Sequence, residues 1–167
     1  AHQLGNLVNT SELASALGVS RRTVIDYIDL LEKFFIVQRL YPYERNLRDV
    51  IRKQFKVYFF DNGIRNAAIG DFRDLYQRDD AGALLENTVV TGVMRRISYD
   101  RKLSEVYFWR DYNGREVDLI VLEPDHCRAI EVKMNKSGHK IPRMVLKHFA
   151  KTEAMIIDVS DAYRFYL

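Results

Sequence analysis

Hydrophobic residues in the first third of the chain follow a helical period and then an alternating, strand-like one. Apolar positions recur every three to four residues in two segments, residues 10–17 and 20–34, which are separated by a glycine-containing turn. Two strand-like segments follow at residues 35–43 and 55–60, and the basic stretch 45–56 lies between them. Two helices followed by a β-hairpin with a basic loop predict a winged helix-turn-helix.

The second half of the chain predicts one helix, three strands, a further helix and a last strand. The expected ranges, in that order, are 82–98, 105–110, 115–122, 127–134, 142–151 and 154–159. The helix over 82–98 has one apolar face, and Glu86 lies at the centre of that face. The order predicts an α/β (α+β) layer fold. We therefore expect three parts: residues 1–62, a connector over 63–81, and residues 82–167.

Charged residues interrupt the two most apolar strands of the second half. Glu116 and Asp118 share one face of the first strand, and Glu131 and Lys133 share one face of the second. A turn centred on Pro124-Asp125 places residue 118 opposite 131 and residue 116 opposite 133. Two opposed carboxylates repel each other, so that a divalent cation or the ammonium group of Lys133 is expected between them.

This pattern predicts a candidate catalytic site. Asp118 and Glu131 are the expected Mg²⁺ ligands, because Mg²⁺ prefers carboxylate oxygens together with water and phosphate. Lys133 could orient a water or stabilise charge that develops on a phosphate, and Glu86 could complete the site from the helix. The alternative interpretation is structural: the charges lie on solvated strand faces, and Glu86 forms a salt bridge with Arg110 or Arg115.

Basic residues in the first part of the chain are candidates for DNA contact. Arg21, Arg22 and Thr23 open the second helix, whose first residues reach base edges or phosphates in DNA-binding proteins of this kind. The hairpin loop adds a group of basic residues, Arg45, Arg48, Arg52, Lys53 and Lys56. Winged helices also bind proteins, and this loop can equally be a solvated one. Residues 24–35 offer an apolar surface that a homo-oligomer could use.

Composition sets further limits on function. The net charge of +3 arises from residues 1–65, since the later residues balance, which is a modest indication of nucleic-acid contact. The chain has no apolar run of membrane-spanning length, and its single cysteine, Cys127, fits a reducing cytoplasm and a core position. It contains no Gly-rich loop ending in Gly-Lys-Ser/Thr, so this stretch cannot itself be a P-loop ATPase.

The order of several short motifs resembles the C-terminal region of a large group of prokaryotic AAA+-type P-loop ATPases. The matching segments cover nearly the whole chain: Leu7–Asn9, Ser11–Ala14, Leu17–Ser20, Thr23-Val24, Tyr27, Leu30–Glu32, Lys56–Gly63, Leu85–Asn87, Phe108–Arg110, Glu116–Asp118 and Glu131–Lys133. In that family this region is a domain of unknown function that combines a winged helix with a module resembling the PD-(D/E)XK nucleases.

The resemblance implies a restriction-endonuclease-like mixed sheet flanked by helices, with Asp118, Glu131 and Lys133 as its catalytic core and Glu86 as the acidic residue of its first helix. Val117 takes the place of the usual proline before the aspartate. The implied function is that of a DNA-associated C-terminal region of an ATPase, with a Mg²⁺-dependent endodeoxyribonuclease activity. The alternative is a catalytically inactive module of the ATPase that binds nucleic acid or protein.

Overall fold

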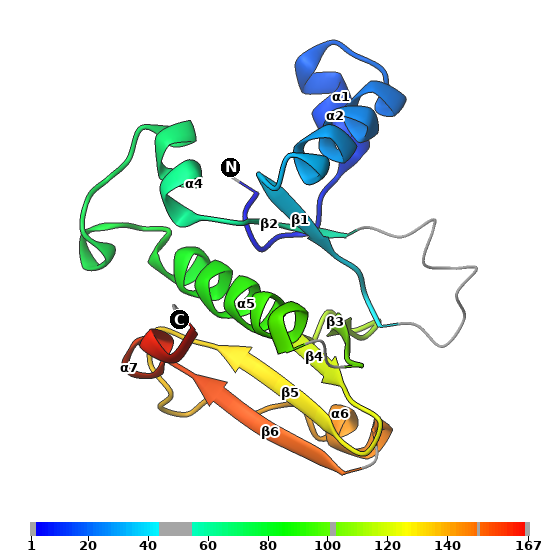
Figure 1. Ribbon diagram of the computed structural model, residues 1–167, viewed down its shortest axis with the longest axis vertical. Helices are drawn as coiled ribbons and strands as arrows, with labels where there is room; N and C mark the ends of the chain where they lie inside the picture. Colours follow the sequence, from blue (N-terminus) through cyan, green and yellow to red (C-terminus); the bar gives the residue numbers. More distant parts are fainter. Residues whose placement is uncertain (1–2, 44–54, 101–102, 150, 166–167) are drawn as a thin grey trace.

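The chain forms a helical unit with a small hairpin, followed by a four-stranded sheet with helices on both faces (Figure 1). The computed structural model describes residues 3–43, 55–100, 103–149 and 151–165. A mixed α/β fold of helices and two sheets, as expected from the sequence, is therefore confirmed.

The first unit contains the two helices and the hairpin that the hydrophobic pattern predicts. They are α1 (Thr10–Leu17), α2 (Arg21–Lys33), β1 (Val37–Leu40) and β2 (Lys56–Phe59). The two strands pair antiparallel, with Val37 opposite Phe59. The turn between the helices depends on Gly18, whose φ of 66° lies in the left-handed region that glycine adopts without strain.

The segment expected to be a connector is folded against its neighbours. It contains α4 (Asn62–Ile69) and the short 3₁₀ helix η1 (Leu75–Gln77). Arg65 and Arg78 are buried and both bind the carboxylate of Asp80, with Arg78 Nε 2.8 Å from Asp80 Oδ1. Two buried guanidiniums around one carboxylate fix this segment beside the helix that follows it.

The larger sheet has the strand order β3-β4-β5-β6. Its strands are β3 (Glu105–Arg110), β4 (Glu116–Leu122), β5 (Cys127–Val132) and β6 (Thr152–Ile157). The first three pair antiparallel, and β6 runs parallel to β5. The helix–three strands–helix–strand order expected from the sequence is confirmed.

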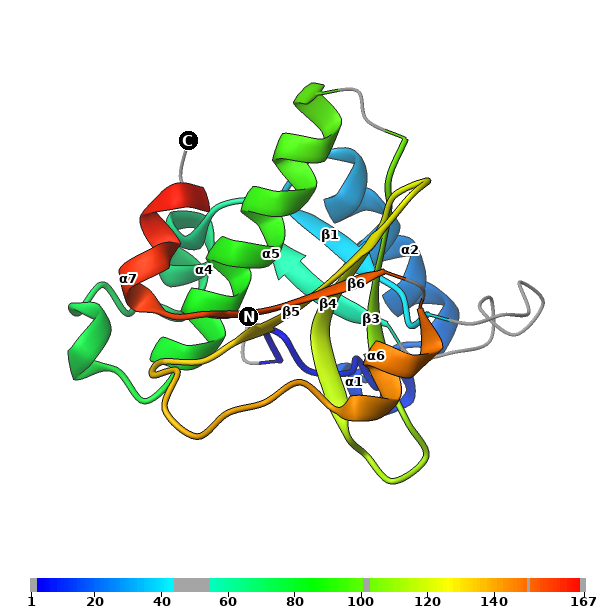
Figure 2. The same cartoon turned by 90° about the horizontal axis from the view of Figure 1, so that it is seen from below.

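Helices cover both faces of this sheet (Figure 2). α5 (Ala81–Asp100), α7 (Val159–Ala162) and the 3₁₀ helix η2 (Tyr163–Phe165) lie on one face, and α6 (Arg143–His148) lies on the other. Val89 and Val93 of α5 belong to the same buried cluster as Leu119, whereas Val145 of α6 packs with Ile120 on the opposite side. The core thus consists of two apolar layers separated by the sheet.

A β-bulge interrupts the pairing of β3 with β4. Tyr107 pairs with Ile120, but Trp109 pairs with Val117, so two residues of β4 lie opposite one residue of β3. Asp118 is one of those two residues. Bulges redirect side chains and are common beside active sites, and here the bulge changes the simple alternation at the position of the candidate aspartate.

The hairpin of the first unit packs directly on α5 and β3. The side-chain amide of Asn87 on α5 accepts from Phe59 N at 2.8 Å and donates to Phe59 O at 2.9 Å, as a neighbouring strand would. Tyr43 N donates to Phe108 O at 2.7 Å. These bonds hold β2 close to the acidic residues of the larger sheet.

Candidate functional site

Four carboxylates, two lysines and a tyrosine gather where β2, α5, β4 and the end of β5 meet. We call this group the carboxylate–lysine cluster; its members are Lys56, Tyr58, Glu86, Glu116, Asp118, Glu131 and Lys133. The sequence predicted that Glu86, Asp118, Glu131 and Lys133 belong to one site. The structure brings these four together and adds residues from the hairpin.

Asp118, Glu131 and Lys133 form the part of the cluster at the end of β5. Lys133 Nζ lies 2.6 Å from Glu131 Oε1 and 3.9 Å from Asp118 Oδ2. Asp118 Oδ2 also accepts a hydrogen bond from Val132 N at 2.8 Å. The β4–β5 ladder ends with Leu119 opposite Ile130, in the predicted register. Beyond that pair, the Asp118 side chain, rather than a backbone carbonyl of β4, accepts the hydrogen bond from Val132 N.

Lys56 is the central cation of the cluster. Its Nζ lies 2.5 Å from Glu116 Oε1, 3.3 Å from Glu86 Oε1 and 4.0 Å from Asp118 Oδ1, and the side chain is 2% exposed. The sequence prediction assigned Lys56 to the basic hairpin loop, and this was wrong because the lysine is a buried strand residue. Strand alternation places Lys56 and Tyr58 on one face of β2, and this pattern could have identified Lys56 as a member of the site.

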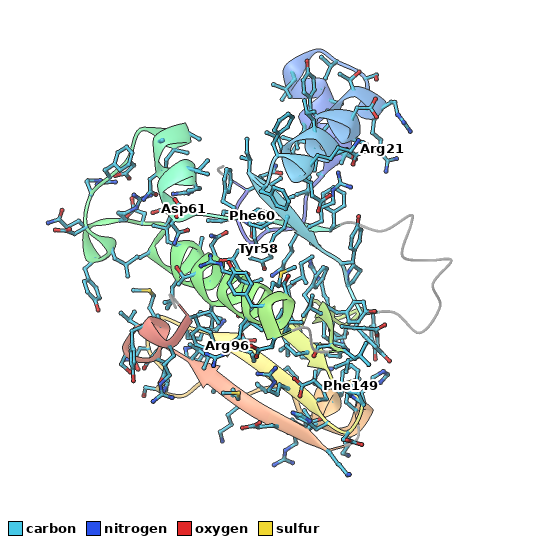
Figure 3. All side chains as sticks on the ribbon, in the orientation of Figure 1. Arg21, Tyr58, Phe60, Asp61, Arg96 and Phe149 are labelled. Atoms are coloured by element: carbon cyan, nitrogen blue, oxygen red, sulfur yellow. The ribbon has the colours of Figure 1, made fainter. Side chains whose placement is uncertain are left out.

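Glu86 receives two hydrogen bonds from the hairpin. Tyr58 Oη donates to Glu86 Oε1 at 2.6 Å, and Lys56 Nζ donates to the same oxygen. Figure 3 shows the Tyr58 side chain directed toward α5. Gly5, with φ of 70°, closes over this carboxylate: a Cβ at that position would lie 3.1 Å from both carboxylate oxygens.

Two expected partnerships within the cluster differ from those observed. Glu116 was expected to face Lys133, but it binds Lys56 and lies 3.7 Å from Arg110. Arg110 and Arg115 were the alternative partners for Glu86. Arg115 instead binds Asp111 at 2.7 Å. Lys56 of β2 supplies the positive charge beside Glu86 that the sequence prediction assigned to Arg110 or Arg115.

Burial controls the protonation of the cluster. It raises the pKa of Glu86 to about 7; the charge of Asp118 adds to this rise, and Lys56 and Tyr58 oppose it. Burial likewise raises the pKa values of Asp118 and Glu131. For Lys56, burial favours the neutral amine, but the surrounding carboxylates outweigh it and raise the pKa. The lysines stay charged while Glu86 exchanges a proton near neutral pH.

The donor set fits one kind of metal site. Glu131 Oε2 is buried and has no hydrogen-bond partner in the described part of the chain, and Asp118 Oδ1 faces Lys56 only at 4.0 Å. Two carboxylates completed by water and a substrate phosphate are a common Mg²⁺ environment. Within the described ranges, no three His, Cys, Asp or Glu side chains are placed to hold a metal ion by themselves. The cluster thus suits a cation that shares its coordination sphere with substrate.

Comparison with known proteins identifies the unit that carries this cluster. Residues 81–166 match the family described as Domain of unknown function (DUF4143). The chain belongs to the DUF4143 family. Residues 1–75 match a second family, Domain of unknown function (DUF8612). Most of the carboxylate–lysine cluster lies in the DUF4143 domain, whereas Lys56 and Tyr58 come from the DUF8612 segment.

Curated relatives align with most of this chain. Uncharacterized proteins of Mycobacterium bovis and Mycobacterium tuberculosis are each 29% identical over 135 residues, which are 80% of this chain and 30% of the relative. An uncharacterized protein of Haemophilus influenzae is 27% identical over 137 residues, 79% of this chain and 31% of the relative. The chain therefore spans about a third of the length of these relatives. No solved structure matches the chain.

The predicted DNA-contacting residues of the DUF8612 segment have different local roles. Arg22 is 82% exposed in its side chain and lies 2.9 Å from Asp26, its i+4 neighbour. Arg21 Nε donates to Thr10 Oγ1 at 2.9 Å, and the Thr23 hydroxyl bonds to that of Ser20, the cap of α2. Arg22 is thus the most available of the three. The predicted loop residues Arg45, Arg48, Arg52 and Lys53 lie outside the described residues.

Two further surfaces bear on partners. The side chains of Tyr27, Leu30, Phe34 and Phe35 are exposed on and after α2, where the sequence predicted an apolar surface. Among the described residues, no helix combines the length and the apolar character needed to cross a membrane. Cys127 is buried, as predicted for a core residue.

Proposed function

We propose that the DUF4143 domain is a Mg²⁺-dependent endodeoxyribonuclease domain of the PD-(D/E)XK type, within the C-terminal region of an AAA+-type ATPase. The observation that carries this proposal is the Asp118–Glu131–Lys133 arrangement: a buried and a partly buried carboxylate, the latter 2.6 Å from the lysine ammonium, at the end of two paired strands. The position of these residues in a helix–three strands–helix–strand order supports it.

The proposed chemistry assigns a role to each group. Asp118 and Glu131 would hold Mg²⁺, which when bound supplies charge stabilisation for a phosphate and acidifies a water. Lys133 is placed to donate a hydrogen bond to a phosphate oxygen as negative charge develops there. Glu86, whose pKa of about 7 lies near the working pH, can accept or donate a proton. Lys56 lies among Glu86, Glu116 and Asp118 and offsets their negative charge.

DNA is the proposed substrate, with the DUF8612 segment as a winged helix that helps to bind it. Arg22 at the start of α2 is exposed and available to phosphates, and the excess positive charge of the chain belongs to residues 1–65. The upstream ATPase domain of the proposed protein would supply ATP binding.

One observation favours a second candidate, a catalytically inactive module that binds DNA or protein for the ATPase. Lys56 already lies among Glu86, Glu116 and Asp118 as an internal cation. A lysine in this position compensates the acidic residues without a metal ion, as it would in a structural polar core.

Incubation of supercoiled plasmid with the complete protein, ATP and Mg²⁺ or Mn²⁺ distinguishes the two candidates. The nuclease proposal predicts nicking or linearisation that is lost in Asp118→Ala and in Glu131→Ala and retained in Glu153→Ala, a variant of an exposed β6 carboxylate. Intact plasmid, together with a salt-dependent DNA affinity that survives both site substitutions, would favour the binding module and overturn the nuclease.

A further inference from the structure

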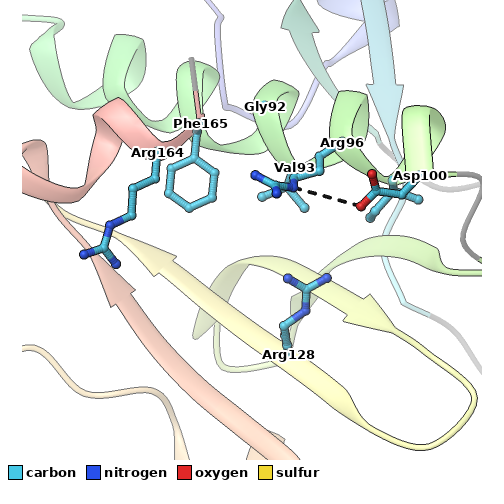
Figure 4. A pocket seen from close by; sticks show the side chains of 8 residues that line it. Gly92, Val93, Arg96, Asp100, Arg128, Arg164 and Phe165 are labelled. Atoms are coloured by element: carbon cyan, nitrogen blue, oxygen red, sulfur yellow. Dashed lines mark ion pairs between the residues drawn. The ribbon is translucent and has the colours of Figure 1, made fainter. Parts of the chain in front are cut away.

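A polar cavity lies between α5, the start of β5 and η2, and it shares no residue with the carboxylate–lysine cluster (Figure 4). Its volume is about 250 Å³. Three arginines line it, one from each element: Arg96, Arg128 and Arg164. Asp100 is the one acidic residue in the described lining, and the ring of Phe165 forms part of the wall. The cavity therefore collects more positive than negative charge.

Arg164 Nε donates to Tyr163 Oη at 3.2 Å, whereas the guanidinium groups of Arg96 and Arg128 are only partly engaged by the described residues. Arg96 Nε lies 4.0 Å from Asp100 Oδ2, a distance beyond that of a hydrogen bond. Arg128 donates to Glu123 Oε1 at 3.0 Å through one terminal nitrogen, but its Nε is buried and has no hydrogen-bond partner among residues the structure describes. A buried donor of this kind calls for an acceptor that the described residues do not supply. In Figure 4 the guanidinium of Arg128 is directed toward that of Arg96 on α5.

We infer that this cavity binds a phosphate group. The guanidiniums of Arg96 and Arg128 are directed toward each other in Figure 4, and like charges repel unless an anion lies between them. Each guanidinium offers several N–H donors in a planar fork. A phosphate has enough oxygens to accept from more than one arginine at once, and arginine–phosphate pairs are commonly bidentate. The side chains of Val93 and Phe165 form an apolar part of the wall of this cavity.

The phosphate can come from a nucleic-acid backbone or from a free nucleotide. Arg128 and Glu131 lie three residues apart on β5, about 10 Å along the strand, and strand alternation directs their side chains to opposite faces of the sheet. A backbone phosphate bound here would belong to the same DNA that the proposed nuclease site engages, and this source alone rests on the proposed function. Binding of a free nucleotide does not depend on it.

Calorimetric titration of the full chain with inorganic phosphate, at constant ionic strength and without divalent metal, tests the inference. We expect saturable binding that weakens about tenfold in Arg128→Gln and in Arg96→Gln. Arg96→Gln guards against misfolding, because that side chain is 69% exposed. Arg115→Gln is the matched control, since Arg115 is also exposed and paired with an aspartate four residues away, and it should bind as wild type does.

Competition identifies the source of the phosphate. Displacement of inorganic phosphate by a short DNA oligonucleotide supports a backbone-phosphate site, and displacement by AMP alone supports a nucleotide site. Absence of phosphate binding in wild type, an equal loss in Arg115→Gln, or competition by neither compound would overturn the inference. Because the readout is binding without metal, inactivity of the proposed nuclease leaves this result unaffected.

Discussion

Lys56 Nζ on β2 lies 3.3 Å from Glu86 Oε1 on α5, and this ion pair joins the DUF8612 segment to the DUF4143 domain. Tyr58, two residues further along the same strand, donates to the same oxygen at 2.6 Å. The hairpin thus completes a site whose other members belong to the larger sheet. The DUF8612 and DUF4143 segments therefore both contribute residues to the carboxylate–lysine cluster.

Loss of the central cation should destabilise the fold. Lys56→Met leaves Glu86, Glu116 and Asp118 close together without their shared counter-charge, and removal of one partner from a buried ion pair costs about 3 kcal/mol or more. Urea denaturation measures the change. Lys147→Met, which removes an exposed lysine of α6, should leave stability close to that of wild type. Equal stability of the two variants would show that Lys56 does not hold the cluster together.

Glu86 should make stability depend on pH around neutrality. Burial raises its folded-state pKa from 4.5 to about 7, so the folded state favours the protonated form. The stability that this preference contributes is fully present below about pH 4.5 and is lost as the pH rises through 7. Between pH 5 and pH 8, wild type should therefore lose about 2–3 kcal/mol relative to Glu86→Gln.

Urea denaturation of both proteins across this pH range gives the comparison. Glu153→Gln, which replaces an exposed carboxylate on β6, should follow the wild-type curve. A constant difference between wild type and Glu86→Gln over the whole range would mean that Glu86 is ionised throughout.

Two glycines of α5 should respond in opposite directions to alanine. A Cβ at Gly92 would clash with Phe165 O and lie 2.7 Å from Phe165 Cβ, so Gly92→Ala forces η2 away from α5 and should cost about 2 kcal/mol. A Cβ at Gly82 meets no described atom within 4 Å, and Gly82→Ala should stabilise the helix by about 0.5–1 kcal/mol. Thermal unfolding shifts of the same sign in both variants would contradict this packing.

The sequence predicted the elements of the fold well because their apolar residues are regularly spaced and their turns are distinct. The register of β4 with β5 followed from the turn at Pro124-Asp125 and is confirmed by the pairing of Leu119 with Ile130. That register is why the relation between Asp118 and Glu131 could be anticipated.

The rest of the site depends on contacts between segments far apart in sequence. Lys56 ends a run of basic residues, so its local composition indicated a solvated loop, and only the packing of β2 on α5 reveals its burial. The bulge at Asp118 is a shift in the register of β3 with β4, and the sequence pattern predicts the two strands but not that shift. The arginines of the cavity beside η2 come from three elements that are each more than 30 residues apart in sequence, and no motif connects them.

The central claim is that Asp118 and Glu131 bind a divalent cation, and Mn²⁺ titration by calorimetry tests it most directly. We expect saturable binding to wild type, its loss in the Asp118→Ala/Glu131→Ala double variant, and its retention within a few-fold in Lys133→Met, because the lysine is assigned to phosphate rather than to metal. Saturable binding that the double variant retains, or no binding to wild type, would contradict the claim. The carboxylate–lysine cluster would then be a structural core held by Lys56 and Lys133.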